Sequence, residues 1–362
     1  MTEEEGSSTE SLASAGAPVV AVDCNGADLG PGEVAAGAAL AAAQGTRVLL
    51  FGPASELGAL PEGVELEDSP VSIAKAPDPV KAARTTPQAS IVKAARAVAE
   101  GRADALVCAG GTGAALAAGT FNIKRAPGIY RPALALPLPI PNSPVTLLDV
   151  GANSEARREH LVQFAFMGAA FARSVLGLAL PRVALLSNGE ESGRGNELVL
   201  ETHAVLAGRT GAALEAFEFV GNVEGDGVVA GLADVVVTDG FTGNIALKLI
   251  EGVSQTMVRA IRDVANSSPR GKLGGLLLRA ALGGFREEID PETPGGAYLL
   301  GLRRLGVVPH GRFTRRGFAQ AILRADRGAR EDVVAATWRA LAAADALKRS
   351  PVSAQAVSLS QR

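Results

Sequence analysis

The chain has 362 residues, of which 47% are hydrophobic, and a formal net charge of −3. This composition can bury a large core, which excludes a disordered protein, and the small net charge gives no sign of nucleic-acid binding. The two cysteines, Cys24 and Cys108, and the three histidines show neither a disulfide framework nor metal-ligand spacing, so we expect no metal site and a reducing cytoplasm.

The two ends of the chain differ in composition from its middle. Residues 1–17 are small, polar and acidic, without the basic and apolar regions of a signal peptide, and residues 346–362 are similarly polar. We therefore expect two flexible tails around one domain at residues 18–345. We find no apolar run long enough to span a bilayer.

Short apolar runs follow one another along this domain, and most lack strict alternation, as expected of strands buried on both faces. They are residues 18–23, 46–52, 103–110, 145–151, 182–189 and 233–240. Alanine-rich stretches of helical character lie between or after them, at residues 32–43, 89–100, 113–119, 159–175, 196–208 and 244–263. The alternation predicts a three-layer α/β/α, Rossmann-like fold with a mostly parallel sheet. The proline-rich segment 131–144 predicts an extended crossing or a connection between lobes.

Most of the predicted strands end in glycine and polar residues, as in AGGTGA (109–114) and TDGFTGN (238–244). Turns favour these residues for backbone reasons alone. Ligands of open α/β sheets, however, bind beyond the carboxyl ends of the strands. Because five such loops occur in one chain, we expect them to converge on one edge of the sheet around a shared ligand.

Three of the loops carry groups suited to anions. The glycine-rich loop at residues 110–113 opens a predicted helix, where free backbone N–H groups bind anions, although it matches neither a Walker loop nor a dinucleotide fingerprint. In the segment 188–197 the guanidinium of Arg194 suits phosphate, whereas we interpret Glu190 and Glu191 as solvated. His310 lies beside a cluster of arginines. No side chain stands out as a nucleophile, so a nucleophile would come from a second substrate.

Together the loops resemble the phosphate acyltransferase family, PlsX, of bacterial phospholipid synthesis. The resemblance runs from Val19 to Arg324, and the shared segments follow the family's order. They are AVDCNGADLGP, EGRADALVCAGGTGA, RPALA, LLDVGAN, LVQFAFMG, PRVALLSNGEESGRGNEL, TDGFTGNIALKLIEG, GGAYLLGL and HG. The chain departs from the family's pattern in places: Gly111 stands where the family has asparagine, and Arg194 where it often has lysine.

The resemblance implies a fold similar to that of isocitrate and isopropylmalate dehydrogenases, a homodimer, and work in the cytoplasm at the inner surface of the membrane. It implies transfer of a long-chain acyl group from acyl carrier protein to inorganic phosphate, with no cofactor. A membrane glycerol-3-phosphate acyltransferase would then use the acyl phosphate. The alternatives are a short-chain phosphate acyl-CoA transferase, a dehydrogenase of similar fold, and a divergent, non-catalytic paralogue that binds a membrane surface.

Such a reaction needs an anion held against a thioester carbonyl and donors for the developing oxyanion. The residues that we expect to be catalytic are Asp239, Asn244, His310 and Arg194. The residues that we expect to bind substrate or phosphate are Asp23, Gly26, Gly110, Gly111, Thr112, Gly113, Asn153, Gly189, Thr242, Gly243 and Lys248.

Two surfaces are predicted to meet partners. Acyl carrier proteins are acidic, so a basic face should steer them. The candidates for that face are Arg303, Arg304, Arg312, Arg315 and Arg316. In the segment 269–288, cations recur every seven residues beside leucines, which on a helix gives a basic stripe next to an apolar face. This segment either packs in a dimer or anchors the protein to anionic lipid, and the resemblance favours the anchor.

Overall fold

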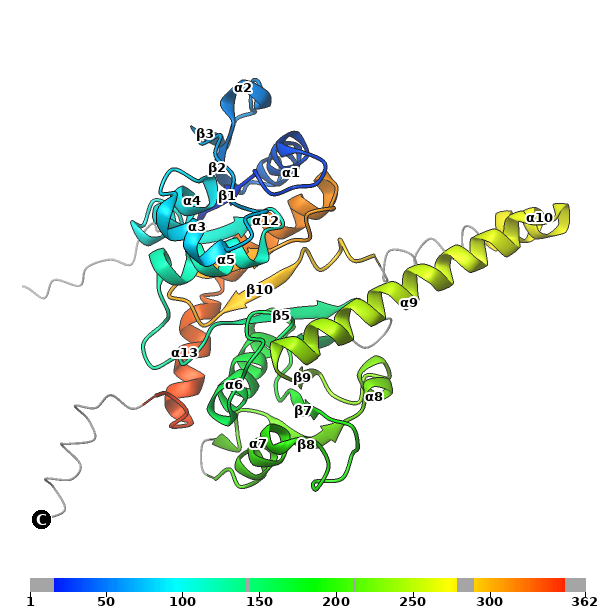
Figure 1. The fold of residues 1–362 in the computed structure, drawn as a ribbon. Coiled ribbons are helices and arrows are strands. Elements are labelled where there is room, and N and C mark those ends of the chain that lie inside the picture. The colour runs from blue at the N-terminus through cyan, green and yellow to red at the C-terminus, as the bar shows by residue number, and fades with distance from the viewer. Residues whose placement is uncertain (1–15, 141–143, 211–212, 279–289, 349–362) are drawn as a thin grey trace, which may run out of the picture.

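The computed structural model describes residues 16–140, 144–210, 213–278 and 290–348. One 11-stranded sheet runs through the molecule, with helices on both of its faces (Figure 1). The strands are β1 (Val19–Asp23), β2 (Arg47–Gly52), β3 (Val64–Asp68), β4 (Ala105–Cys108), β5 (Ala133–Leu138), β6 (Val145–Leu148), β7 (Arg182–Leu186), β8 (Glu218–Val223), β9 (Val235–Val237), β10 (Ala297–Leu300) and β11 (Leu305–Val308). The helices are α1 (Pro31–Ala42), α2 (Ala54–Leu57), α3 (Pro79–Thr85), α4 (Ser90–Ala99), α5 (Thr112–Ala118), η1 (Gly119–Ile123), α6 (Arg158–Val175), α7 (Glu197–Ala207), α8 (Gly225–Val229), α9 (Gly240–Asn266), α10 (Pro269–Leu278), α12 (Arg315–Arg330) and α13 (Val333–Ala343).

Two buried apolar clusters lie on opposite faces of the sheet, because neighbouring residues of a strand point to opposite sides. Val20 and Val22 of β1 belong to the cluster that α1, α6, α12 and α13 cover. Ala21 of the same strand belongs to the cluster that α4 and α5 cover. The predicted three-layer α/β/α fold is therefore confirmed.

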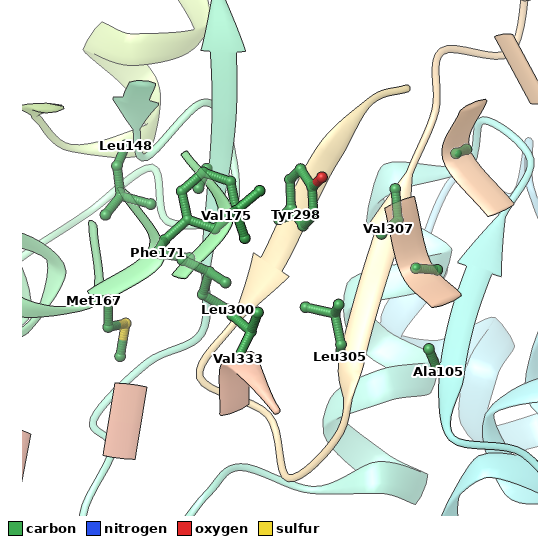
Figure 2. Packing of buried hydrophobic residues seen from close by; sticks show 14 of the residues in the cluster. Ala105, Leu148, Met167, Phe171, Val175, Tyr298, Leu300, Leu305, Val307 and Val333 are labelled. Carbon is green, nitrogen blue, oxygen red and sulfur yellow. The ribbon is translucent and has the colours of Figure 1, made fainter. Parts of the chain in front are cut away.

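The middle of the sheet packs against α6, as Figure 2 shows for the first cluster. Phe171 of α6 meets Tyr298 of β10 edge to face, with ring centroids 4.6 Å apart. Met167 and Leu300 belong to the same cluster. These contacts fix the two short C-terminal strands, β10 and β11, in the centre of the fold, between β4 and β5.

The sheet has two halves whose strands run in opposite directions. The strands β1, β2, β3, β4 and β11 are parallel to one another, and so are β6, β7, β8 and β9. Between the halves, the pairs β11–β10, β10–β5 and β5–β6 are all antiparallel. Three reversals leave the second half pointing opposite to the first, so the carboxyl ends of the two halves lie at opposite edges. The prediction that all the polar loops share one edge is wrong for this reason.

The segment 131–144 does more than cross between the halves, because it contains the central strand β5. At the C-terminal end, the carbonyl of Ala346 accepts a hydrogen bond from Gln163 Nε2 at 2.8 Å, and Lys348 N donates to the carbonyl of Gly128 at 2.8 Å. The rest of the predicted C-terminal tail, and residues 1–15 of the N-terminal one, lie outside the described residues.

The long helix α9 extends well away from the body of the molecule, and α10 follows at its far end (Figure 1). The first half of the predicted partner segment 269–288 is α10, where the leucines from Leu276 to Leu278 are exposed. Its second half, residues 279–288, lies outside the described residues. No helix in the described ranges is long and apolar enough to cross a membrane.

Candidate active site

The loops after β1, β4 and β11 meet at the edge where these strands end. The N–H of Asp28 donates to the carbonyl of Gly311 at 2.7 Å. A Cβ at Gly26 would lie 1.8 Å from the carbonyl oxygen of Ala109, and one at Gly110 would lie 2.6 Å from Gly311 Cα. Glycine is therefore required at both positions so that the three backbones can approach this closely.

His310 sits in the loop after β11, half-buried at this meeting point. Burial lowers the pKa of His310, and the positive charges of Arg312 and Lys248 lower this pKa further. The N–H of Arg312 donates to His310 Nδ1 at 3.4 Å. In the neutral imidazole, this contact places the proton on Nε2, which leaves Nε2–H as a donor.

A carboxylate of α9 holds two cations beside this loop. Glu251 Oε2 lies 3.0 Å from Lys248 Nζ and 3.5 Å from Arg312 Nη2. Two cations near closely packed glycine backbones can bind an anion such as phosphate. The predicted binding residue Lys248 and the predicted catalytic residue His310 are thus brought together.

The loops after β6 and β9 meet at the opposite edge of the sheet, where α9 begins. The N–H of Gly240 donates to the carbonyl of Asn153 at 2.8 Å. One N–H of the Asn244 side chain donates to the carbonyl of Val150 at 3.1 Å. The amide of asparagine has two donors, so Asn244 keeps a second one for a substrate.

The polar residues of TDGFTGN form the cap of α9. The carboxylate of Asp239 accepts hydrogen bonds from Phe241 N at 3.0 Å, Thr242 N at 2.9 Å and Thr242 Oγ1 at 2.7 Å. This is the N-cap of a helix of 27 residues. A Cβ at Gly243 would lie 1.9 Å from the carbonyl oxygen of Asp149, so the first turn of α9 packs directly on the β6 loop.

The helix α9 connects the two groups of loops. Asn244, Lys248 and Glu251 are spaced four and three residues apart, so they lie on one face of the helix. Asn244 touches the loop after β6, and Glu251 touches the loop after β11. The candidate site is therefore a strip along this face of α9, with a glycine-rich loop at each end.

Arg194 and Gly189 lie in a third place, the loop after β7. Arg194 Nε is 3.5 Å from Glu191 Oε2, and both side chains are exposed. Asn222 of β8 holds this loop by donating to the carbonyls of Glu191, at 2.9 Å, and Arg194, at 3.4 Å. Within the described ranges, the hydrogen bonds and the ion pair of this loop join it to β8, to α7 and to itself, and none joins it to the strip on α9.

Other predicted residues occupy supporting positions. Asp23 is buried, and its carboxylate accepts a hydrogen bond from Ser90 Oγ at 2.6 Å. The same carboxylate accepts a hydrogen bond from Asn25 N at 3.2 Å, so this side chain fixes the loop after β1 from within. Gly111 is the N-cap of α5, and Thr112 and Gly113 are exposed in its first turn.

Two residues that sequence reasoning missed are Asp149 and Glu251. Asp149 follows β6 directly and is fully buried, and its position before VGAN at a strand end was the available signal. Glu251 lies seven residues after Asn244, and that helical spacing was the available signal.

Solved structures place the fold among three-layer α/β enzymes. A phosphotransacetylase from Staphylococcus aureus matches with a TM-score of 0.56 at 18% identity, covering 86% of this chain and 94% of that one. A 4-hydroxythreonine-4-phosphate dehydrogenase from Klebsiella pneumoniae matches with a TM-score of 0.50 at 16% identity, covering 86% and 98%. Similarity at such low identity shows the fold alone.

Sequence relatives show the family. A model described as fatty acid synthesis protein matches residues 19–336. A phosphate acyltransferase from Thermobifida fusca is 42% identical over 84% of this chain and 86% of its own length. A phosphate acyltransferase from Latilactobacillus sakei is 43% identical over 81% of this chain and 88% of its own length. The protein is an acyltransferase. It belongs to the phosphate acyltransferase family, which confirms the resemblance seen in its motifs.

Proposed function

We propose that this enzyme transfers a long-chain acyl group from acyl carrier protein to inorganic phosphate, giving an acyl phosphate for phosphatidic acid and phospholipid synthesis. The observation that carries this proposal is the pair of cations, Lys248 and Arg312, beside the glycine-rich loops and the neutral His310. This arrangement suits a small anion next to a hydrogen-bond donor, as the reaction requires.

The reaction needs no nucleophile from the protein. An oxygen of phosphate attacks the thioester carbonyl, and the C–S bond breaks as the thiolate leaves with the electron pair. A thiol has an unperturbed pKa of about 8.5, so the thiolate is a competent leaving group without strong acid catalysis. Holding phosphate against the carbonyl contributes by proximity. The free N–H of Asn244 and the Nε2–H of His310 are the donors that we assign to the developing oxyanion or the departing thiolate.

The decisive experiment combines purified protein, a long-chain acyl carrier protein and phosphate, and measures acyl phosphate. We expect product only when phosphate is present, and the same rate with a chelator. Butyryl-CoA and acetyl-CoA serve as matched donors, and we expect a lower kcat/KM for both. A higher kcat/KM for the short-chain donors would support the short-chain transferase instead. No phosphate-dependent turnover would support the non-catalytic paralogue.

The proposed docking face for acyl carrier protein is smaller than the sequence predicts. Arg303 and Arg304 lie in the turn between β10 and β11, at the end of β11 opposite to His310. Arg312, Arg315 and Arg316 follow His310 and remain the candidates. The KM for acyl carrier protein should rise with salt, and Arg315→Gln should raise this KM while the control Arg303→Gln should not.

We also propose that the enzyme is a homodimer bound peripherally at the inner face of the cell membrane. A row of exposed apolar side chains runs along α9, which we call the α9 stripe. It consists of Leu249, Val253, Met257 and Val264, which lie within about 80° of one another around the helix. A surface helix rarely exposes such a continuous stripe unless a partner covers it, and we assign it to a second copy of the chain. The leucines of α10 are assigned to lipid, close to the membrane acyltransferase that takes up the product.

A further inference from the structure

One buried carboxylate organises the whole loop after β6. Asp149 is 0% exposed. Its Oδ1 accepts hydrogen bonds from the N–H groups of Leu134 at 3.0 Å, Gly151 at 3.1 Å and Ala152 at 3.0 Å. Its Oδ2 accepts from Asn153 N and from Asn153 Nδ2, both at 2.8 Å. Burial raises the pKa of Asp149, but all five partners are N–H donors, which favour the carboxylate form. Hydrogen bonds to an ionised group are stronger than neutral ones, so these five hold the loop in one conformation.

The loop in turn presents two carbonyl groups to α9. The carbonyl of Val150 accepts from Asn244 Nδ2 at 3.1 Å, and the carbonyl of Asn153 accepts from Gly240 N at 2.8 Å. Asn153 is itself tied to the start of β5, because its Nδ2 also donates to the carbonyl of Pro132 at 2.8 Å. The orientation of the Asn244 amide is therefore set by a loop whose shape depends on one carboxylate.

We infer that Asp149 is a positioning residue for catalysis, which holds the Asn244 amide in the direction needed by the reacting group. The inference rests on the proposed function, because it takes Asn244 to be the donor to phosphate or oxyanion. Preorganised donors are effective because the protein does not have to reorient them during the reaction. The carboxylate contributes by fixing the loop, and it touches no substrate.

The test is a double-mutant cycle between Asp149→Asn and Asn244→Ala. Asparagine at position 149 keeps one oxygen for the three donors at Oδ1 but turns an NH2 toward both donors of Asn153, which releases that residue from the loop. We expect Asp149→Asn and Asn244→Ala each to lower kcat by about 100-fold. Because Asp149 acts through Asn244, we expect the double variant to be no slower than Asn244→Ala alone.

The matched control is Asp234→Asn. This carboxylate lies just before β9, and it binds Arg182 through the backbone N–H at 2.7 Å and Nη2 at 2.8 Å. The substitution Asp234→Asn should destabilise the same half of the sheet without changing a contact of the loop after β6. Its effect on kcat should be small and should add to that of Asn244→Ala. A thermal melt of every variant separates loss of fold from loss of positioning.

The possible results of this cycle distinguish failure of the positioning role from failure of the proposed function. Additive effects of Asp149→Asn and Asn244→Ala on kcat would overturn the positioning role and leave the proposed function standing. Normal rates for Asn244→Ala would overturn the assignment of Asn244 and this inference with it. Absence of phosphate-dependent turnover in the parent protein would overturn the proposed function itself, and with it this inference. If Asp149→Asn does not fold, Asn153→Ala enters the same cycle, and additivity there would overturn the inference.

Discussion

The carboxylate of Glu251 on α9 lies 3.5 Å from the guanidinium of Arg312 in the loop after β11. Glu251 Oε2 also lies 3.0 Å from Lys248 Nζ. A single carboxylate of the protein therefore neutralises part of the positive charge that we propose to bind phosphate. The same contact connects α9, which belongs to the second half of the sheet, to the first half.

Replacing Glu251 with glutamine should therefore strengthen phosphate binding. Glutamine keeps the size of the side chain and a hydrogen-bond acceptor but removes the negative charge. A partly exposed ion pair is worth about 1 kcal/mol, so we expect the KM for phosphate to fall roughly fivefold, measured by initial rates over a phosphate series. The control is Glu331→Gln, which breaks the 2.6 Å ion pair with Arg327 on α12. An unchanged or higher KM in Glu251→Gln would contradict the assignment of the two cations.

The catalytic role that we predict for Asp239 can be separated from its role as the N-cap of α9. Asp239→Ala removes the cap of α9 and should lower the free energy of unfolding by about 1 kcal/mol. Asp239→Asn keeps a good capping side chain, so its melting temperature should stay near that of the parent. If Asp239 orients a donor or accepts a proton from phosphate, Asp239→Asn should still lower kcat by at least about tenfold. If Asp239→Asn turns over at the rate of the parent, Asp239 acts only as the cap of α9.

The pH dependence of the reaction should show His310. Its pKa is lowered from the ordinary value of 6.5, first by burial and then by Arg312 and Lys248. Activity that needs the neutral ring should be full at neutral pH and fall with a midpoint below 6.5. Arg312→Gln should move this midpoint upward, because a nearby positive charge is removed. His310→Gln should remove this loss of activity at low pH. If the loss persists in that variant, it arises from the titration of another group.

The same shift predicts a change in stability with pH. In the folded state His310 binds a proton less readily than in the unfolded chain, where its pKa is near 6.5. Stability from this group is complete above that value and is lost as the pH falls toward the lower folded pKa. Denaturant titrations of the parent and of His310→Gln across this range measure the contribution.

The α9 stripe should form the contact between two copies of the chain. A lysine at Val253 or Met257, which are 61% and 58% exposed, places a charge in that contact without disturbing the core of the monomer. We expect Val253→Lys and Met257→Lys to shift the protein toward monomer in sedimentation velocity. Arg262→Glu, about 180° around the helix from Val253, is the control and should leave the assembly unchanged. A dimer that survives both lysine variants would place the interface elsewhere.

The leucines of α10 should bind lipid. Replacing Leu276, Leu277 and Leu278 with serine removes apolar side chains that are all more than half exposed. We expect the parent protein to bind anionic vesicles reversibly and less strongly in salt, and the triple variant to lose this binding while remaining dimeric. Loss of the dimer, together with no vesicle binding by the parent, would show that these leucines pack against the partner copy instead.

Local patterns in the sequence predicted many elements of the fold well. The stretch 159–175 is α6 (Arg158–Val175), because its apolar residues repeat with the period of a helix buried against a sheet. The strands β10 and β11 were not predicted, since each has only four residues and gains its stability from β4 and β5, far away in the chain. The direction of each half of the sheet depends on these same pairings, which is why the single shared edge was wrong.

The residues of the candidate site also divide into those that the sequence indicated and those that it did not. Motif order indicated Asn244, Lys248 and His310, and the structure places Lys248 near His310 and one turn of α9 from Asn244. The grouping of Arg194 with them stays a prediction. Asp149 and Glu251 were missed because their importance arises from contacts with residues that are distant in sequence, which no local pattern contains.

The strand order of the sheet also constrains how the chain folds during synthesis. β11 pairs with β4 and β10 pairs with β5, yet both strands come after α9 and α10 in the chain. While the protein emerges from the ribosome, one edge of β4 and one edge of β5 have no native neighbour until residues 297–308 have been made. Unpaired strand edges invite association with other chains. Nascent chains of this protein should therefore depend on protection by chaperones for longer than those of a fold whose sheet is completed in sequence order.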